Sequence, residues 1–157
     1  MNHQLSSVER VRLALATAGL DARIEEFPAS TRTAQDAAAA IGTSVGQIVK
    51  SLLLLAEDSP VLALMSGANQ LDLARLASLA GSSIHKADAE AVRAATSYAI
   101  GGVPPLGFPN AIPTFIDRDL LQYETIWAAA GTPRHVFELA PSELVRITGG
   151  TVADLRS

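Results

Sequence analysis

The chain has 157 residues, 48% of them hydrophobic, which suits one domain over residues 1–157 built around one core. It contains no cysteine, which excludes a disulfide framework, a thiolate nucleophile and any cysteine-ligated metal site. The net charge of −4 excludes a broad basic surface for nucleic acid, so any RNA contact must be small. No basic segment followed by an apolar run begins the chain, and we expect a cytoplasmic protein that binds neither membrane nor DNA, metal or cofactor.

The first half of the chain predicts helices alternating with strands. A capping box at Ser6–Glu9 begins the first helix, and Thr33 can cap an alanine-rich one. Two apolar runs flank a Glu-Asp-Ser-Pro turn and therefore predict a hairpin. The predicted elements are helices over 7–18 and 34–41, a short turn over 44–47, and strands over 22–27, 51–56 and 61–65.

The second half continues the same mixture. Asn69 can cap a helix whose leucines share one face until Gly81, and Asp88 can cap another over 89–95. The remaining predicted elements are strands over 113–117, 125–130 and 136–139 and a helix after Pro141. The hairpin disfavours a doubly wound parallel sheet, so the sequence predicts a single α/β domain with a mixed sheet flanked by helices.

Lys50 is the first residue that could carry chemistry. It stands between Ile48-Val49 and a run of leucines, which places its ammonium at the mouth of a strand or in a partly desolvated position. A charge in such a position acts strongly on a neighbouring anion. The alternative is a lysine that simply ends an apolar run and extends into solvent.

The segment from Gly101 to Gly107 packs glycine and proline too densely for a helix or an inner strand. Its backbone N–H groups could hold an oxyanion or a phosphate, while Pro104 and Pro105 stiffen the path. The alternative is an ordinary tight connection between two elements. A second glycine turn, Gly131-Thr132-Pro133, could form another wall of the same pocket or be a plain β-turn.

The other polar residues give weaker indications of a catalytic or binding role. His3, His85 and His135 show no metal-ligand spacing, and no serine lies in a pattern that would build a catalytic triad. His135, beside the second glycine turn, could touch a substrate or occupy a strand end. Asp117 and Asp119 would point to different faces, and Asp117 suits a strand-to-helix cap, which argues against paired carboxylates.

Four segments together resemble the YbaK family, also called the prolyl-tRNA synthetase-associated domain. They are Gln47-Ile-Val-Lys-Ser-Leu-Leu-Leu54, Gln70-Leu-Asp-Leu73, Gly101-Gly-Val-Pro-Pro-Leu-Gly107 and Gly131-Thr-Pro133. Each is weak alone, but their order and spacing cover nearly the whole chain. The resemblance implies a mixed, barrel-like sheet flanked by helices, with a pocket between Lys50 and the two glycine loops.

The resemblance also implies a reaction: hydrolysis of the ester between an amino acid and the terminal ribose of a mischarged tRNA, usually tRNA for proline. Family members act as free-standing proofreaders that grip the acceptor end, and a prolyl-tRNA synthetase is a further candidate partner. In this reading, backbone groups at Gly101 and Gly102 bind the oxyanion and Lys50 holds the ribose-phosphate end or the substrate. A neighbouring ribose hydroxyl activates the attacking water, and no cofactor is needed.

The family's amino-acid pocket corresponds here to Phe27, Thr31 and Thr33. The substrate-binding loop residues it implies are Val103, Pro105, Gly107, Gly131, Thr132 and Pro133. The cysteine-clearing branch carries a polar residue where this chain has Ala129, and the alanine-clearing branch carries Lys-Asn where this chain has Lys50-Ser51. Alanine, 2-aminobutyrate and serine therefore remain open as the amino acid removed.

Two other functions stay open at this point. The chain could be a non-catalytic module that keeps the pocket for an aminoacyl or nucleotide ligand, or that docks a synthetase. It could also be a small hydrolase that acts on unrelated esters through the same loop.

Overall fold

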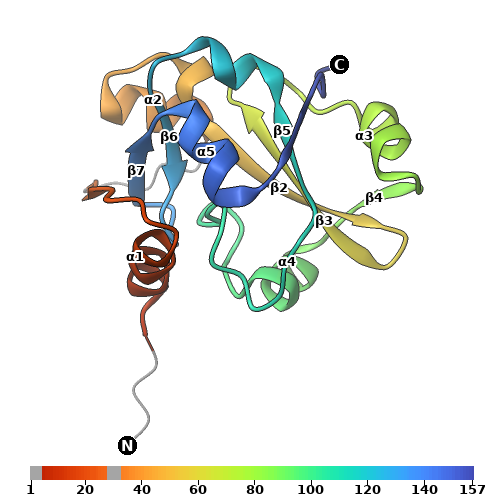
Figure 1. Ribbon diagram of the computed structural model, residues 1–157, viewed down its shortest axis with the longest axis horizontal. Helices are drawn as coiled ribbons and strands as arrows, with labels where there is room; N and C mark the ends of the chain where they lie inside the picture. The colour runs from red at the N-terminus through yellow and green to blue at the C-terminus, as the bar shows by residue number, and fades with distance from the viewer. Residues whose placement is uncertain (1–4, 28–32) are drawn as a thin grey trace, which may run out of the picture.

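The computed structural model describes residues 5–27 and 33–157 (Figure 1). Their α-helices are α1 (Ser7–Thr17), α2 (Ala34–Ile41), α3 (Leu73–Ala80), α4 (Ala89–Thr96) and α5 (Pro141–Thr148). Their strands are β1 (Ile24–Glu26), β2 (Val49–Ala56), β3 (Ser59–Ser66), β4 (Ile84–Lys86), β5 (Thr114–Asp117), β6 (Ile126–Ala129), β7 (His135–Leu139) and β8 (Thr151–Ala153). Two 3₁₀ helices, η1 (Val45–Gln47) and η2 (Arg118–Gln122), complete the set. The predicted mixed α/β class is confirmed.

The strands form two sheets. One has five strands in the order β4-β2-β3-β5-β8, and the other has three in the order β1-β7-β6. The predicted hairpin is β2 paired antiparallel with β3, whereas β5 runs parallel to β3 and to β8, so the larger sheet is mixed. An isolated bridge between Ile48 and Trp127 joins the two sheets, and this junction gives the fold its partly closed, barrel-like character.

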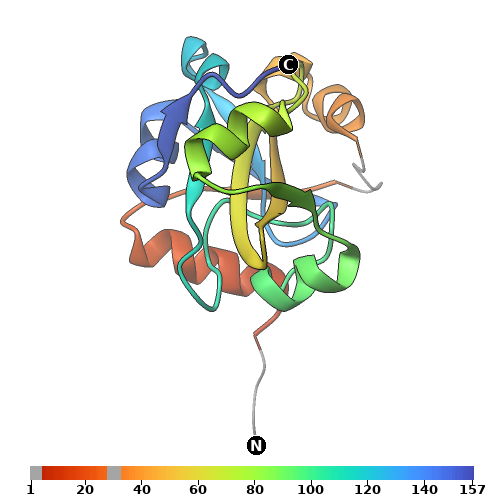
Figure 2. The same cartoon turned by 90° about the vertical axis from the view of Figure 1, so that its right-hand side faces the viewer.

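Strand β3 is apolar along its length because both of its faces are buried. Leu62 and Leu64 belong to the larger core cluster, together with Val11 and Leu15 of α1. Ala63 and Met65 point to the opposite face and pack in a second cluster with residues that include Leu76 of α3. Figure 2 shows α3 lying across this face of the sheet. A strand buried on both faces reads as a continuous hydrophobic run, which is the pattern in the sequence.

Most of the predicted boundaries hold, and the predicted caps at Thr33 and Asp88 are confirmed because each side chain accepts an N–H from its helix. The cap assigned to Asn69 is wrong. Asp72 caps α3 instead, accepting the N–H groups of Ala74 and Arg75. Strand β2 begins two residues earlier than predicted, so Lys50 lies within the strand. Within the described ranges, no helix is long and apolar enough to cross a membrane.

Candidate active site

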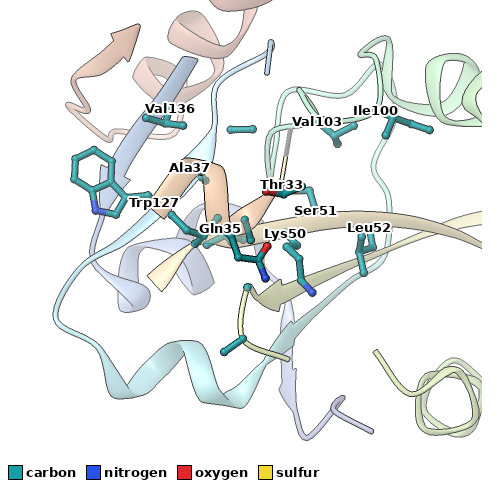
Figure 3. A pocket seen from close by; sticks show the side chains of 18 of the residues that line it. Thr33, Gln35, Ala37, Lys50, Ser51, Leu52, Ile100, Val103, Trp127 and Val136 are labelled. Carbon is teal, nitrogen blue, oxygen red and sulfur yellow. The ribbon is translucent and has the colours of Figure 1, made fainter. Parts of the chain in front are cut away.

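A cavity of about 490 Å³ lies where β2, the start of α2, the loop after α4 and the β6–β7 connection meet (Figure 3). Five residues that the sequence selected line it: Thr33, Lys50, Gly101, Val103 and Thr132. They come from segments far apart in the chain, so the fold brings together what the motif order suggested. His135 lines the same cavity.

Lys50 stands on β2, paired with Met65 of β3. Its Nζ donates a hydrogen bond of 2.5 Å to the backbone carbonyl of Asn69. Burial lowers the pKa of Lys50 below its ordinary value, and the carboxylate of Asp117 opposes this shift. An ammonium with reduced hydration at a cavity wall interacts strongly with an anionic group that enters the cavity.

Asn69 links Lys50 to two carboxylates. Its Nδ2 donates to Asp117 Oδ2 at 2.9 Å and to Asp119 Oδ2 at 2.8 Å. Asp117 is 1% exposed and also accepts the backbone N–H groups of Ser66 and Asp119. The buried carboxylate is therefore well satisfied, and it fixes the residue whose carbonyl holds the lysine. The predicted capping role of Asp117 at η2 is confirmed. The prediction that Asp117 and Asp119 point to different faces is wrong, because the chain turns into η2 after Asp117 and both carboxylates accept from Asn69 Nδ2.

Residues 155–157 support the same loop. Arg156 Nη1 lies 3.2 Å from Asp119 Oδ2, and the Ser157 N–H donates to the carbonyl of Gln70 at 2.9 Å. The Asp72 N–H donates to the carbonyl of Leu155 at 2.8 Å. The loop that carries Asn69 is thus fixed on one side by β5 and η2 and on the other by residues 155–157.

The loop after α4 contributes Gly101 and Val103 to the lining of the cavity. Gly101 has a φ of 91°, a left-handed conformation that favours glycine, and Val103 is 4% exposed. Within the part of the chain that the structure describes, the N–H groups of Gly101 and Val103 have no acceptor. The Gly102 N–H is bonded to the Ala99 carbonyl at 3.0 Å. The available donors are therefore Gly101 and Val103, whereas the sequence analysis selected Gly101 and Gly102.

Gly102 instead allows the two glycine loops to pack closely against each other. Its carbonyl accepts the N–H of Gly131 at 3.0 Å. A Cβ on Gly102 would lie 2.7 Å from Thr132 Cα and 2.8 Å from the Gly131 carbonyl oxygen. Because backbone atoms cannot move aside as a flexible side chain can, only glycine fits here without separating the loops.

Replacing Gly102 by alanine is expected to lower the free energy of unfolding by about 1–3 kcal/mol, the usual cost of overpacking. It should also displace the cavity wall. Gly42→Ala is a comparison variant with a different cause of destabilisation, since an added Cβ meets nothing within 4 Å there and its cost comes only from the φ of 85°. Denaturant unfolding measures both variants. Equal stability of Gly102→Ala and the parent protein would contradict the close loop contact.

Pro105 and Gly107 were predicted to bind the substrate, but they are not among the described residues that line the cavity. Pro105 is buried. The carbonyl of Gly107 accepts the Tyr98 hydroxyl at 3.1 Å, and a Cβ on Gly107 would approach the side chain of Ala14 of α1 to 3.2 Å. These residues shape the loop by packing it against α1 and Tyr98.

Phe27, Gly131 and Pro133 are likewise absent from the described lining of the cavity. The Phe27 N–H donates to the carbonyl of Arg134, which attaches the end of β1 to the second glycine loop. A Cβ on Gly131 would lie 2.7 Å from the Ser7 carbonyl oxygen, so this loop also packs on the start of α1. Thr31 lies outside the described residues.

His135 is hydrogen-bonded at one ring nitrogen and has a carboxylate near the other. Its Nδ1 lies 2.5 Å from Thr132 Oγ1, and its Nε2 lies 3.6 Å from Glu26 Oε2. The ring therefore has a fixed orientation at the cavity wall. In the described parts of the chain, no group of three or more histidine, aspartate or glutamate side chains could hold a metal ion.

Asn69 is a lining residue of the cavity that was not predicted from the sequence. A signal was present, because Asn69 and Asp72 both precede the same helix and only one of them can cap it. The spare residue is then available for another role. The apolar lining residues, such as Trp127 and Ile100, carried no local signal, since each is one of many hydrophobic residues near a strand or loop end.

Comparison with known proteins identifies the class to which this fold and site belong. Residues 28–147 match the family model described as an aminoacyl-tRNA editing domain, and the chain belongs to that family. The resemblance read from the four sequence segments is confirmed.

Individual relatives agree. The chain is 32% identical over 128 residues to EbsC of Enterococcus faecalis, a candidate Cys-tRNA(Pro)/Cys-tRNA(Cys) deacylase, covering 78% of this chain and 76% of that one. A crystal structure described as a candidate trans-editing enzyme for prolyl tRNA synthetase has 47% identity, a TM-score of 0.93 and 99% coverage of both chains. A proline–tRNA ligase of Nitratidesulfovibrio vulgaris is 33% identical over 101 residues, which are 63% of this chain and 18% of the ligase.

Proposed function

We propose that the protein is a free-standing hydrolase that removes a small non-cognate amino acid from mischarged tRNA, with tRNA for proline as the substrate class. The observation that carries this proposal is that Lys50, Gly101 and Val103 line one cavity, and that the N–H groups of Gly101 and Val103 have no acceptor among the described residues. Membership of the editing family and the names of the relatives support the same reaction.

The chemistry follows from these groups. Water attacks the ester carbonyl carbon, and the carbonyl oxygen becomes an oxyanion that accepts hydrogen bonds from Gly101 and Val103. The ester C–O bond then breaks, the ribose oxygen takes a proton, and the free amino acid leaves. Lys50 binds the ribose-phosphate end of the substrate, and the neighbouring ribose hydroxyl assists the attacking water. Donors fixed before the reaction need no reorganisation as the charge develops.

The lining of the cavity suits a small, mostly apolar side chain. Ala37, Ala128, Ala129 and Val136 contribute short side chains to the lining, and Trp127 contributes a large one. One methylene group in such a pocket is worth about 1–3 kcal/mol, so several small amino acids can be cleared at different rates. Because the chain carries a net charge of −4, we propose that it grips only the acceptor end.

The direct test is a deacylation time course. Purified protein is incubated with tRNA for proline charged separately with alanine, serine, 2-aminobutyrate, cysteine or proline, and a reaction without protein gives the background. The expected result is release of one or more of the small non-cognate amino acids, with Pro-tRNA left intact. Binding of the charged tRNA without any release would overturn the hydrolase and favour a non-catalytic binding module.

A further inference from the structure

A second cavity of about 430 Å³ adjoins the candidate active site. The two cavities share Ser51 and Leu52 of β2 and Ile100, Gly101 and Val103 of the loop after α4. Figure 3 shows Ile100 and Val103 across from Ser51 and Leu52. The remaining lining of the second cavity is apolar except for one basic residue: Leu53, Leu54, Leu71, Leu73, Lys86, Ala87 and Val92. The two cavities therefore adjoin along the five residues that they share and are together named the groove, whose first part has more polar lining residues than its second.

The groove follows an open edge of β2. Strand β4 pairs with β2 only from Leu54 to Ala56, and at the other end Ile48 is bridged to Trp127. Between these points, residues 49–53 have no strand partner on that edge within the described chain. The edge is open because β4 is only three residues long and the chain then turns into α4.

The residues shared by the two cavities include one with a buried polar group that lacks a hydrogen-bond partner among the described residues. The hydroxyl of Ser51 is buried and has no hydrogen-bond partner among the described residues. Buried polar groups are nearly always paired, so this hydroxyl is available to a ligand group that displaces the atoms covering it. Each cavity also has a positively charged residue in its lining, which suits an anionic ligand. The chain has two lysines, and Lys50 lines the first cavity while Lys86 lines the second.

We propose that the second cavity binds the base of the terminal adenosine of tRNA while the aminoacyl group occupies the first. This inference rests on the proposed function. The ribose and its ester then sit at the junction, beside Lys50, Gly101 and Val103. The flat faces of the base lie against aliphatic side chains, including Ile100, which is 59% exposed in the free protein. Lys86, at the rim, faces the preceding phosphate.

Leu73 offers a way to fill this cavity without touching the first. Leu73→Trp places a large side chain in the second cavity, and Leu79→Trp is the matched control, because Leu79 is an exposed residue of the same helix outside both cavities. Thermal melting checks that both variants fold. Lys86→Met, at an exposed position, serves as a second variant if Leu73→Trp does not fold.

The readouts are the KM and kcat for deacylation of mischarged tRNA and inhibition by AMP and by ribose 5-phosphate, which lacks the base. In Leu73→Trp, KM and the AMP inhibition constant are expected to rise about tenfold, the scale of losing one base contact. The kcat changes much less, and ribose 5-phosphate inhibits the parent and the variant equally. For Lys86→Met, inhibition by AMP weakens and inhibition by adenosine does not.

The outcomes separate this inference from the proposed function. If the parent deacylates tRNA but Leu73→Trp keeps the parental KM and AMP inhibition, the base site is overturned and the hydrolase stands. If the parent releases no amino acid, the proposed function fails, and calorimetry with AMP still decides the cavity. AMP binding that Leu73→Trp abolishes and Leu79→Trp preserves then supports an adenine-nucleotide site, and absence of binding overturns it.

Discussion

Lys50→Met is expected to lower kcat/KM for deacylation by about 10²- to 10³-fold, the usual loss when one preorganised electrostatic group is removed from a hydrolytic site. Methionine keeps much of the length and the apolar contacts of lysine, so the change removes mainly the charge and its hydrogen bond to the Asn69 carbonyl. Single-turnover deacylation measures the loss directly. Retention of full activity would exclude Lys50 from the mechanism.

The expected stability of this variant follows from the direction in which the Lys50 pKa is shifted. Because burial lowers that pKa below 10.5, the unfolded chain binds this proton more tightly than the folded protein. Stability of the parent therefore rises with pH between the lowered value and 10.5, and at neutral pH the charged lysine is a net cost. Lys50→Met should be at least as stable as the parent at neutral pH, with an advantage that shrinks at alkaline pH. Denaturant unfolding at both pH values tests this.

Asp117→Asn is expected to move the alkaline limit of activity to lower pH. The negative charge of Asp117 raises the Lys50 pKa and opposes the effect of burial. Without that charge, Lys50 loses its proton at a lower pH, and a reaction that needs the ammonium falls off earlier as pH rises. The measurement is kcat/KM against pH, corrected for the spontaneous hydrolysis of the ester.

Asp119→Asn is the matched control for this pH profile. Asp119 also accepts a hydrogen bond from Asn69, but it is more exposed than Asp117 and does not shift the Lys50 pKa. We expect the alkaline limit of activity of Asp119→Asn to stay close to that of the parent protein. Asp117→Asn also leaves buried donors poorly paired, which costs about 1–3 kcal/mol of stability, so the profile is measured where the variant remains folded. Identical profiles for both variants would rule out Asp117 as the group that keeps Lys50 charged.

Local patterns predicted the parts of the fold that local forces determine. Helix α2 begins after the Thr33 cap and ends before Gly42, and the β2–β3 hairpin flanks its polar turn. Strands β4 and β8 escaped prediction because no alternating run surrounds their three residues, whereas the equally short β1 lies within the alternating run over 22–27. They are strands only because β2 and β5 offer them edges to pair with.

Part of the lining of the candidate site could also be predicted from the sequence. Lys50 and the two glycine loops were found because their order along the chain is distinctive. The choice between Gly102 and Val103 as donor depends on the bond from Gly102 to Ala99, which no sequence pattern records. The role of Asn69 depends on Asp117 and Asp119, which lie about fifty residues away and meet it only in the folded protein.

The contacts of residues 155–157 bear on how the protein is handled. Ser157 is bonded to Gln70, and Arg156 pairs with Asp119, so the loop that carries the lysine's acceptor is anchored to these residues. A purification tag or surface linkage joined directly after Ser157 would pull on that anchor. Preparations immobilised next to Ser157 and preparations immobilised at a site away from this loop are therefore different samples for kinetic work.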